Sequence, residues 1–182
     1  MITTNIINAY LDLLLKNIDR NRKHFFIFNP MDGYDDNTDK SDFTLNEDKL
    51  VKTFERYLGR RINIFQKDIL IFPHWAGTKN ESNGHFSCVI CNLDDQMIVG
   101  LDSLLPSTST NHKVTSEIAK YMRIIRRSLV KHAENENEGP KSYSIQLRDD
   151  IAEQKDGTSC GIFMLEFIRR FMKAEKDLKF RQ

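Results

Sequence analysis

Apolar residues recur at helical spacing in several stretches of the chain and stand in short runs in others. The helical spacing predicts helices over residues 5–18, 46–58, 113–131 and 160–173. In the first helix the pattern rests on Ile6, Tyr10, Leu13, Leu14 and Ile18. Runs rich in β-branched and aromatic residues predict strands over residues 24–28, 68–72, 85–93, 96–101 and 142–147.

Polar segments containing glycine or proline separate these elements. We expect loops from Asn29 to Asp42 and from His74 to Gly84, the second beginning where Pro73 ends a strand. The chain shows no repeat, low-complexity tract or interdomain linker, so we expect one domain over residues 1–182. Helices precede and follow a group of strands, and this order indicates an α+β fold.

The composition is that of an ordinary globular protein, with 40% hydrophobic and 29% charged residues. A formal net charge of +1 argues against a dedicated nucleic-acid-binding protein. No apolar run reaches the roughly 18 residues of a membrane span, and the first residues lack the basic start of a secretory signal peptide. The three cysteines do not suit a disulfide framework. We therefore expect a monomer in a reducing compartment: cytoplasm or nucleus, or the cytosol of a host cell.

Cys160 is the candidate nucleophile. It lies between Gly157 and Gly161, directly before the pattern of the last helix. A cysteine at a helix N-terminus faces unpaired N–H groups and the positive end of the helix dipole, which favour the thiolate. A cysteine that only packs the start of the helix is the alternative, and it is the commoner case for a cysteine without companions.

His85 and Asp102 are candidate partners of that cysteine. A thiolate protease needs an imidazole beside the sulfur and usually a carboxylate or amide behind the imidazole. His85 begins one predicted strand and Asp102 follows the next, with a turn at Asp94-Asp95 between the two strands. In an antiparallel hairpin the start of the first strand lies beside the end of the second. We therefore expect the two side chains to be close together.

Other residues offer alternatives that the sequence leaves open. His74 is a second candidate base, although the residues after it form no hairpin strand. His85, Cys88 and Cys91 have a spacing seen in metal sites, but residues 88 and 91 of a strand point to opposite faces. No further cysteine pair completes a zinc site, so we expect Cys88 and Cys91 to be packing residues and no metal to be bound.

Gln154 is a candidate donor to the oxyanion that forms in acyl transfer, together with the backbone N–H of Cys160. The alternative is a solvated loop glutamine. The segment that contains Gln154 leads directly into the nucleophile, which favours the first interpretation.

The order His85, Asp102-Ser103, Gln154, Cys160-Gly161 resembles that of the ubiquitin-like protease (Ulp, or sentrin-specific protease) family of clan CE. The local sequences FSCVICNLDDQMIVGLDSL and EQKDGTSCGIFMLEF are also similar to that family, and the similarity covers nearly the whole chain. The resemblance implies a central mixed or antiparallel sheet flanked by helices. It also implies a cysteine protease that cleaves after the C-terminal glycines of a ubiquitin-like modifier, without a cofactor. Cys160 would be the nucleophile, His85 the base, Asp102 its orienting acid and Gln154 the oxyanion donor.

The chain departs from the family around the substrate. Phe86 replaces the tryptophan that usually follows the histidine, and Ser159 stands where an aspartate commonly precedes the cysteine. A second clamp tryptophan would fall at about Met1. We expect Phe86, Trp75, Gly157 and Ser159 to contact the modifier tail. The modifier is SUMO, ubiquitin or a neddylation modifier, with SUMO favoured.

Competing functions share these residues. The same triad serves deubiquitinases, deneddylases and some bacterial acetyltransferases, and a binding module can retain a dead site. The basic residues of the third predicted helix are compatible with nucleic-acid binding, but the nearly neutral chain favours a solvated helix face, so we expect neither a nucleic acid nor a membrane as partner. These basic residues are Lys120, Arg123, Arg126, Arg127 and Lys131.

Overall fold

The computed structural model describes residues 4–17, 24–29, 46–60, 62–76, 84–105, 112–136, 141–175 and 177–180. The helices are α1 (Thr4–Asn17), α2 (Glu47–Gly59), α3 (His112–Asn135) and α4 (Cys160–Met172), with a short 3-10 helix at Ile64–Gln66. The strands are β1 (Phe25–Ile27), β2 (Ile69–Ala76), β3 (His85–Asn92), β4 (Met97–Leu101) and β5 (Ser144–Leu147). Every helix and strand expected from the sequence is present. Most of the loop expected from Asn29 to Asp42 lies outside the described residues.

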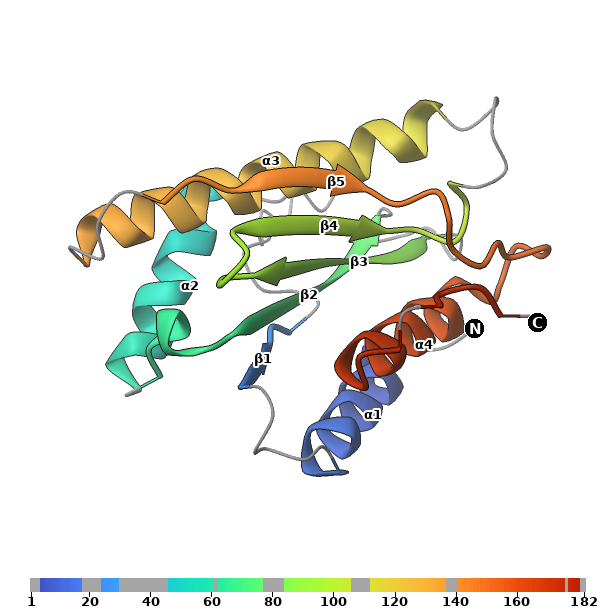
Figure 1. Ribbon diagram of the computed structural model, residues 1–182, viewed down its shortest axis with the longest axis horizontal. Helices are drawn as coiled ribbons and strands as arrows, with labels where there is room; N and C mark the ends of the chain where they lie inside the picture. The colour runs from blue at the N-terminus through green and yellow to red at the C-terminus, as the bar shows by residue number, and fades with distance from the viewer. Residues whose placement is uncertain are drawn as a thin grey trace, which may run out of the picture.

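The strands form one mixed sheet in the order β1-β2-β3-β4-β5 (Figure 1). β3 runs antiparallel to both of its neighbours, β2 and β4, whereas β1 pairs with β2 and β5 with β4 in parallel. Parallel neighbours need a crossover connection. Here α2 joins β1 to β2 and α3 joins β4 to β5. The expected central mixed sheet flanked by helices is confirmed.

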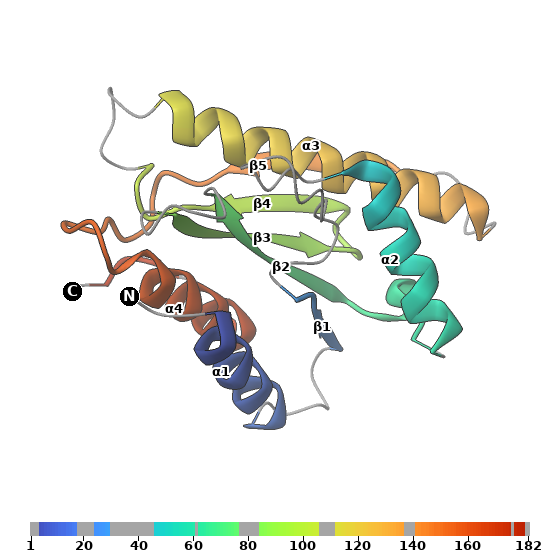
Figure 2. The same ribbon diagram turned by 180° about the vertical axis from the view of Figure 1, so that it is seen from behind.

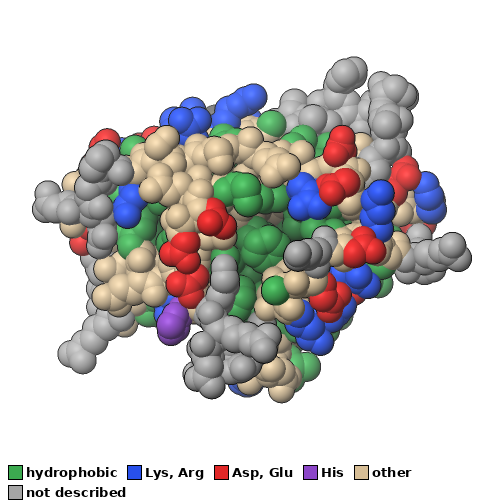
Figure 3. Space-filling model, viewed as in Figure 1, with side chains coloured by type: hydrophobic (Ala, Val, Ile, Leu, Met, Phe, Trp, Pro, Cys, Tyr) green, Lys and Arg blue, Asp and Glu red, His purple; other side chains and the backbone are tan. Residues whose placement is uncertain are grey.

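Helices cover both faces of the sheet. α2 and α3 lie on one face, and α1 and α4 lie on the other (Figures 1 and 2). Alternate strand residues fill the two resulting layers: Phe86, Cys88 and Ile90 face α4, whereas Val89 and Cys91 face α3. Hydrophobic side chains also reach the surface in the middle of the face seen in Figure 3, with charged side chains around them.

The expectation that Pro73 ends the second strand is wrong, because β2 continues beyond it. Pro73 pairs with Cys88, and His74 and Trp75 pair with the next residues of β3. β1 reaches only as far as Ile71. Beyond that residue β2 has no neighbouring strand on this side within the described residues, and a proline does not interrupt a ladder at such an edge. His74 and Trp75 therefore lie in a strand and not in a loop.

The inward face of α1 agrees only in part with the apolar positions expected from the sequence. Of these, Tyr10 and Leu14 pack against the core. Ile7 and Leu11 are buried in the layer that contains α4, whereas Ile6 and Leu13 are each 54% exposed. The helix carries apolar residues on several sides, so periodicity alone does not say which stripe packs inward. The packing of α1 against α4 determines which stripe is buried.

The basic face of α3 is partly neutralised by α2. Arg127 forms an ion pair with Glu47 at 2.5 Å, and Lys131 forms one with Asp48 at 2.8 Å. These pairs support the interpretation of the face as a solvated helix surface. Among the described residues, no helix is both long and apolar enough to span a membrane.

Candidate active site

Cys160 is the first residue of α4, and the turn before it is built by Asp156. The carboxylate of Asp156 accepts hydrogen bonds from the backbone N–H groups of Thr158 (2.9 Å) and Ser159 (2.8 Å), and from the Ser159 hydroxyl (2.6 Å). Sequence reasoning missed this role of Asp156, although aspartate side chains in turns commonly accept the backbone N–H two residues further on. The turn places the sulfur at the positive end of the helix.

His85 and Asp102 meet across the β3–β4 hairpin, as the hairpin argument expected. The pairing of Cys88 with Leu101 brings the start of β3 beside the end of β4. His85 Nε2 lies 2.6 Å from Asp102 Oδ1, and the same oxygen accepts the backbone N–H of Leu104 at 2.9 Å. Asp102 is 1% exposed, so its carboxylate is fixed in the interior. The contact through Nε2 leaves Nδ1 of the ring for the cysteine.

Cys160 is the third member of this arrangement, because it lies close enough to His85 for each side chain to shift the pKa of the other. Burial opposes the charge of His85, but the hydrogen bonds to Asp102 and Cys160 raise the pKa of this histidine to about 9. Burial also opposes a thiolate at Cys160. Its hydrogen bonds with His85 and with the backbone of Phe86 and Gly161 nevertheless lower its pKa below the ordinary value. The pair therefore favours a thiolate beside an imidazolium, which is the reactive form of a cysteine nucleophile.

This ion pair predicts the pH dependence of alkylation. Because the Cys160 thiolate is stabilised, we expect its reaction with iodoacetamide to have a midpoint below 9.0, the ordinary thiol value. Asp102→Asn should move the midpoint upward, because it withdraws the charge that stabilises the imidazolium. Mass spectrometry of alkylated peptides measures both, with Cys88 and Cys91 as unreactive internal controls. An unchanged midpoint in the variant would contradict this account.

Gln154 lies in the interior, 6% exposed, and is held by hydrogen bonds on two sides. Its Oε1 accepts from the Ser103 hydroxyl at 2.5 Å, and its Nε2 donates to the carbonyl oxygen of Asp156 at 2.8 Å. A solvated loop glutamine would have neither contact. Apart from its place directly after Asp102, nothing in the sequence pointed to the participation of Ser103.

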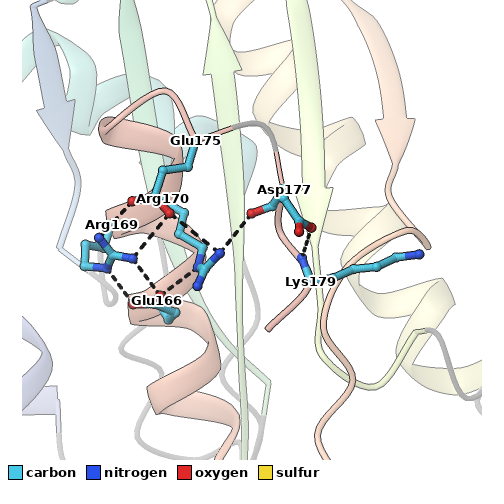
Figure 4. A network of polar contacts seen from close by, with 6 residues as sticks. All are labelled: Glu166, Arg169, Arg170, Glu175, Asp177 and Lys179. Atoms are coloured by element: carbon cyan, nitrogen blue, oxygen red, sulfur yellow. Dashed lines mark hydrogen bonds and ion pairs between the residues drawn. The ribbon is translucent and has the colours of Figure 1, made fainter. Parts of the chain in front are cut away.

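The C-terminal segment supports the stretch before Gln154. The N–H of Ala152 donates to the carbonyl oxygen of Leu178 at 3.0 Å. That segment is tied to α4 by Arg170, which donates to the carbonyl oxygen of Asp177 at 3.1 Å (Figure 4). The hydrogen bond from Arg169, together with the one from Arg170, lowers the pKa of Glu166 on the same helix to about 2, although burial acts in the opposite direction. This polar network therefore fixes the end of the chain beside the site.

His74 is poorly suited to act as a base. It is 6% exposed and its ring stacks on Tyr121, with ring centroids 4.1 Å apart. Burial, with a smaller contribution from the charge of His85, lowers the pKa of His74 to about 3. Asp102 hydrogen-bonds to His85 instead.

Cys88 and Cys91 are packing residues, as expected. They point to opposite faces of β3, and burial raises the pKa of both thiols. Within the described part of the chain, no group of three or more His, Cys, Asp or Glu side chains could hold a metal ion.

The residues expected around the substrate occupy different environments. Phe86 is 3% exposed and lies behind the partly exposed Trp75, with ring centroids 4.4 Å apart. The indole lies directly against Gly84, where an added Cβ would stand 1.7 Å from Trp75 Cζ2. Gly157 faces open space, with no atom within 4 Å of the position of a Cβ. Ser159 is partly exposed beside Cys160.

Comparison with known proteins identifies relatives of this chain. Residues 1–180 match the family model described as the Ulp1 protease family, C-terminal catalytic domain. The ubiquitin-like-specific protease ESD4 of Arabidopsis thaliana is 25% identical over 173 residues, which make up 92% of this chain and 32% of ESD4. The chain thus spans about a third of the length of that curated relative.

Solved structures show the same fold. The Ulp1 protease domain in complex with Smt3, the yeast ortholog of SUMO, has a TM-score of 0.64 and 19% identity, over 99% of this chain and 69% of that one. A de-sumoylating protease has a TM-score of 0.59 and 15% identity, over 92% of this chain and 59% of that one. Because the family match extends over nearly the whole sequence, from residue 1 to residue 180, the chain belongs to the Ulp1 protease family.

Proposed function

We propose that this chain is a cysteine protease that cleaves after the C-terminal glycines of a ubiquitin-like modifier, with a SUMO-type modifier favoured. It removes the modifier from lysines or matures its precursor. The observation that carries the proposal is the place of the His85 ring, whose Nε2 lies 2.6 Å from Asp102 and which interacts with Cys160 at the start of α4. Membership of the family supports the reaction class, and the relatives named for SUMO support the choice of modifier. We propose further that residues 1–182 act as a single catalytic domain in the cytoplasm or nucleus.

The proposed reaction begins with attack of the Cys160 thiolate on the carbonyl carbon of the terminal glycine. Gln154 stabilises the resulting oxyanion through its side-chain N–H. The C–N bond then breaks, and His85 gives its proton to the leaving amine, so that a thioester remains on the sulfur. Water attacks the thioester while His85 takes its proton. The modifier leaves with a free carboxylate, and the thiolate and the imidazolium are restored. Asp102 keeps the imidazole oriented throughout.

The modifier tail reaches the sulfur in an extended form in this proposal. Trp75 supplies the aromatic surface beside the histidine, and the buried Phe86 supports the indole from behind. Gly157 leaves room for backbone before Cys160, because glycine adds no side chain there, and the partly exposed Ser159 lies next to the cysteine. Glycines in the tail fit such a passage better than residues with side chains.

Labelling with modifier probes tests the function. SUMO, ubiquitin and the neddylation modifier, each carrying a C-terminal electrophile, are incubated with the wild-type chain and with Cys160→Ala. We expect the SUMO probe to label the wild-type chain fastest and none to label the variant. Faster labelling by ubiquitin or the neddylation modifier would reassign the modifier. Failure of every probe would favour a binding module, and turnover of acetyl-CoA would favour an acetyltransferase.

A further inference from the structure

Ser103 is a buried hydroxyl that connects the end of β4 to Gln154. It is 1% exposed and directly follows Asp102. Its Oγ donates to Gln154 Oε1 at 2.5 Å, and its carbonyl oxygen accepts the backbone N–H of Gln154 at 3.1 Å. The glutamine is therefore tied to Ser103 through both its side chain and its backbone.

These contacts determine the orientation of the Gln154 side-chain amide, that is, which residue its NH₂ group faces and which residue its Oε1 faces. Nε2 lies 2.8 Å from the carbonyl oxygen of Asp156, which can only accept a hydrogen bond. The NH₂ group must therefore face Asp156, and Oε1 must face Ser103, whose hydroxyl can donate. A reversed amide would set two oxygens against each other. One N–H of the amide is used by Asp156, and the second remains for a ligand.

The turn that carries Ser103 is itself fixed by Asp102. The carboxylate of Asp102 accepts a hydrogen bond from the backbone N–H of Leu104 at 2.9 Å. The backbone carbonyl oxygen of Asp102 accepts one from the N–H of Leu105 at 3.1 Å. The same carboxylate holds His85. Two adjacent residues thus reach two different parts of the site, the imidazole through Asp102 and the glutamine amide through Ser103.

We propose that Ser103 is a positioning residue, whose hydroxyl holds the Gln154 amide so that N–H and not C=O meets the developing oxyanion. This inference rests on the proposed function, in which Gln154 stabilises that oxyanion. Without the hydroxyl, Oε1 would be a buried acceptor without a partner, and such a group favours rotation of the side chain away from its place. The loss would appear in the chemical step and not in the binding of the modifier.

The first test compares Ser103→Ala with a matched control. With a fluorogenic SUMO C-terminal amide as substrate, we expect kcat to fall roughly 10-fold or more with little change in KM, short of the roughly 100- to 1000-fold cost of losing an oxyanion donor. Ser87→Ala is the control, because Ser87 is also buried in the sheet and its hydroxyl makes no hydrogen bond within the described residues. Equal kcat values for Ser103→Ala and Ser87→Ala would overturn the proposal.

A double-mutant cycle with Gln154→Ala separates positioning from a purely structural role. If Ser103 acts through the glutamine, Ser103→Ala should have little further effect on kcat in the Gln154→Ala background. Independent effects that multiply would overturn the inference about Ser103 while leaving the function intact. A Gln154→Ala variant with wild-type kcat would instead overturn the proposed role of Gln154.

A second pair of variants keeps the test decisive if Ser103→Ala does not fold. Ser103→Thr and Ser103→Val have nearly the same shape and differ in the hydroxyl. Thermal unfolding establishes that both are folded, and we expect kcat of the threonine variant to exceed that of the valine variant roughly 10-fold or more, the factor expected for Ser103→Ala. Equal kcat values would overturn the proposal.

Discussion

Cys160→Ala is expected to lower cleavage of a SUMO precursor by roughly 10⁴-fold or more, because no other group can form the thioester. The variant should still fold, since alanine keeps the Cβ and the side chain is small. It should also still bind the modifier, because the residues proposed to contact the modifier tail are unchanged. Gel analysis of the precursor and calorimetry of modifier binding measure the two properties separately.

Cys91→Ala is the matched control for this variant. Cys91 is also a buried thiol, but it faces α3 on the other side of the sheet from α4. We expect its activity to stay close to that of the wild-type chain, with only a loss of stability from the small cavity. Hydrolysis of the precursor by the Cys160→Ala variant would contradict the proposed mechanism.

His85→Ala is expected to lower kcat by roughly 10⁴-fold, a loss of the size found when one member of a catalytic triad is removed. The alanine variant lacks both the proton donor for the leaving amine and the charge that stabilises the thiolate. In the same variant, Cys160 should no longer be alkylated rapidly at pH values below the ordinary pKa of a thiol. Single-turnover kinetics and the alkylation profile measure these losses.

His74→Phe is the comparison for His85→Ala. Phenylalanine keeps an aromatic ring against Tyr121 and removes both ring nitrogens. Because the low pKa of His74 keeps it neutral, we expect kcat to change by only a few-fold. A large loss in His74→Phe combined with a mild effect of His85→Ala would move the base to His74.

The proximity of His85 and Asp102 could be predicted from the sequence because it is local. A short turn at Asp94-Asp95 fixes the register of two consecutive strands, and the register fixes which ends meet. The opposite orientation of Cys88 and Cys91 follows from the same alternation of side chains. These relations need only the hairpin and not the rest of the fold.

The meeting of Cys160 with His85 is different. It depends on how α4 packs against the sheet, and the two residues are far apart in the sequence. The pattern around Cys160 predicted a helix start, and the needs of thiol chemistry made His85 a candidate partner. No geometric argument from the sequence brought the two residues together, and the resemblance to a family supported their pairing. The contacts of Gln154 with Ser103 and Asp156 likewise depend on the path of an irregular segment, which no periodic pattern describes.

By itself, the sequence determined the helices and strands, the hairpin register and the residue types available for thiol chemistry. These depend on apolar periodicity and on turns between neighbouring segments. Only the tertiary structure decided that β2 continues through Pro73, that Ile7 and Leu11 are the inward face of α1, and that Ser103 holds the Gln154 amide. Each of these features depends on a segment that is distant in the sequence and packs against the residues concerned. A local sequence pattern carries no information about that segment.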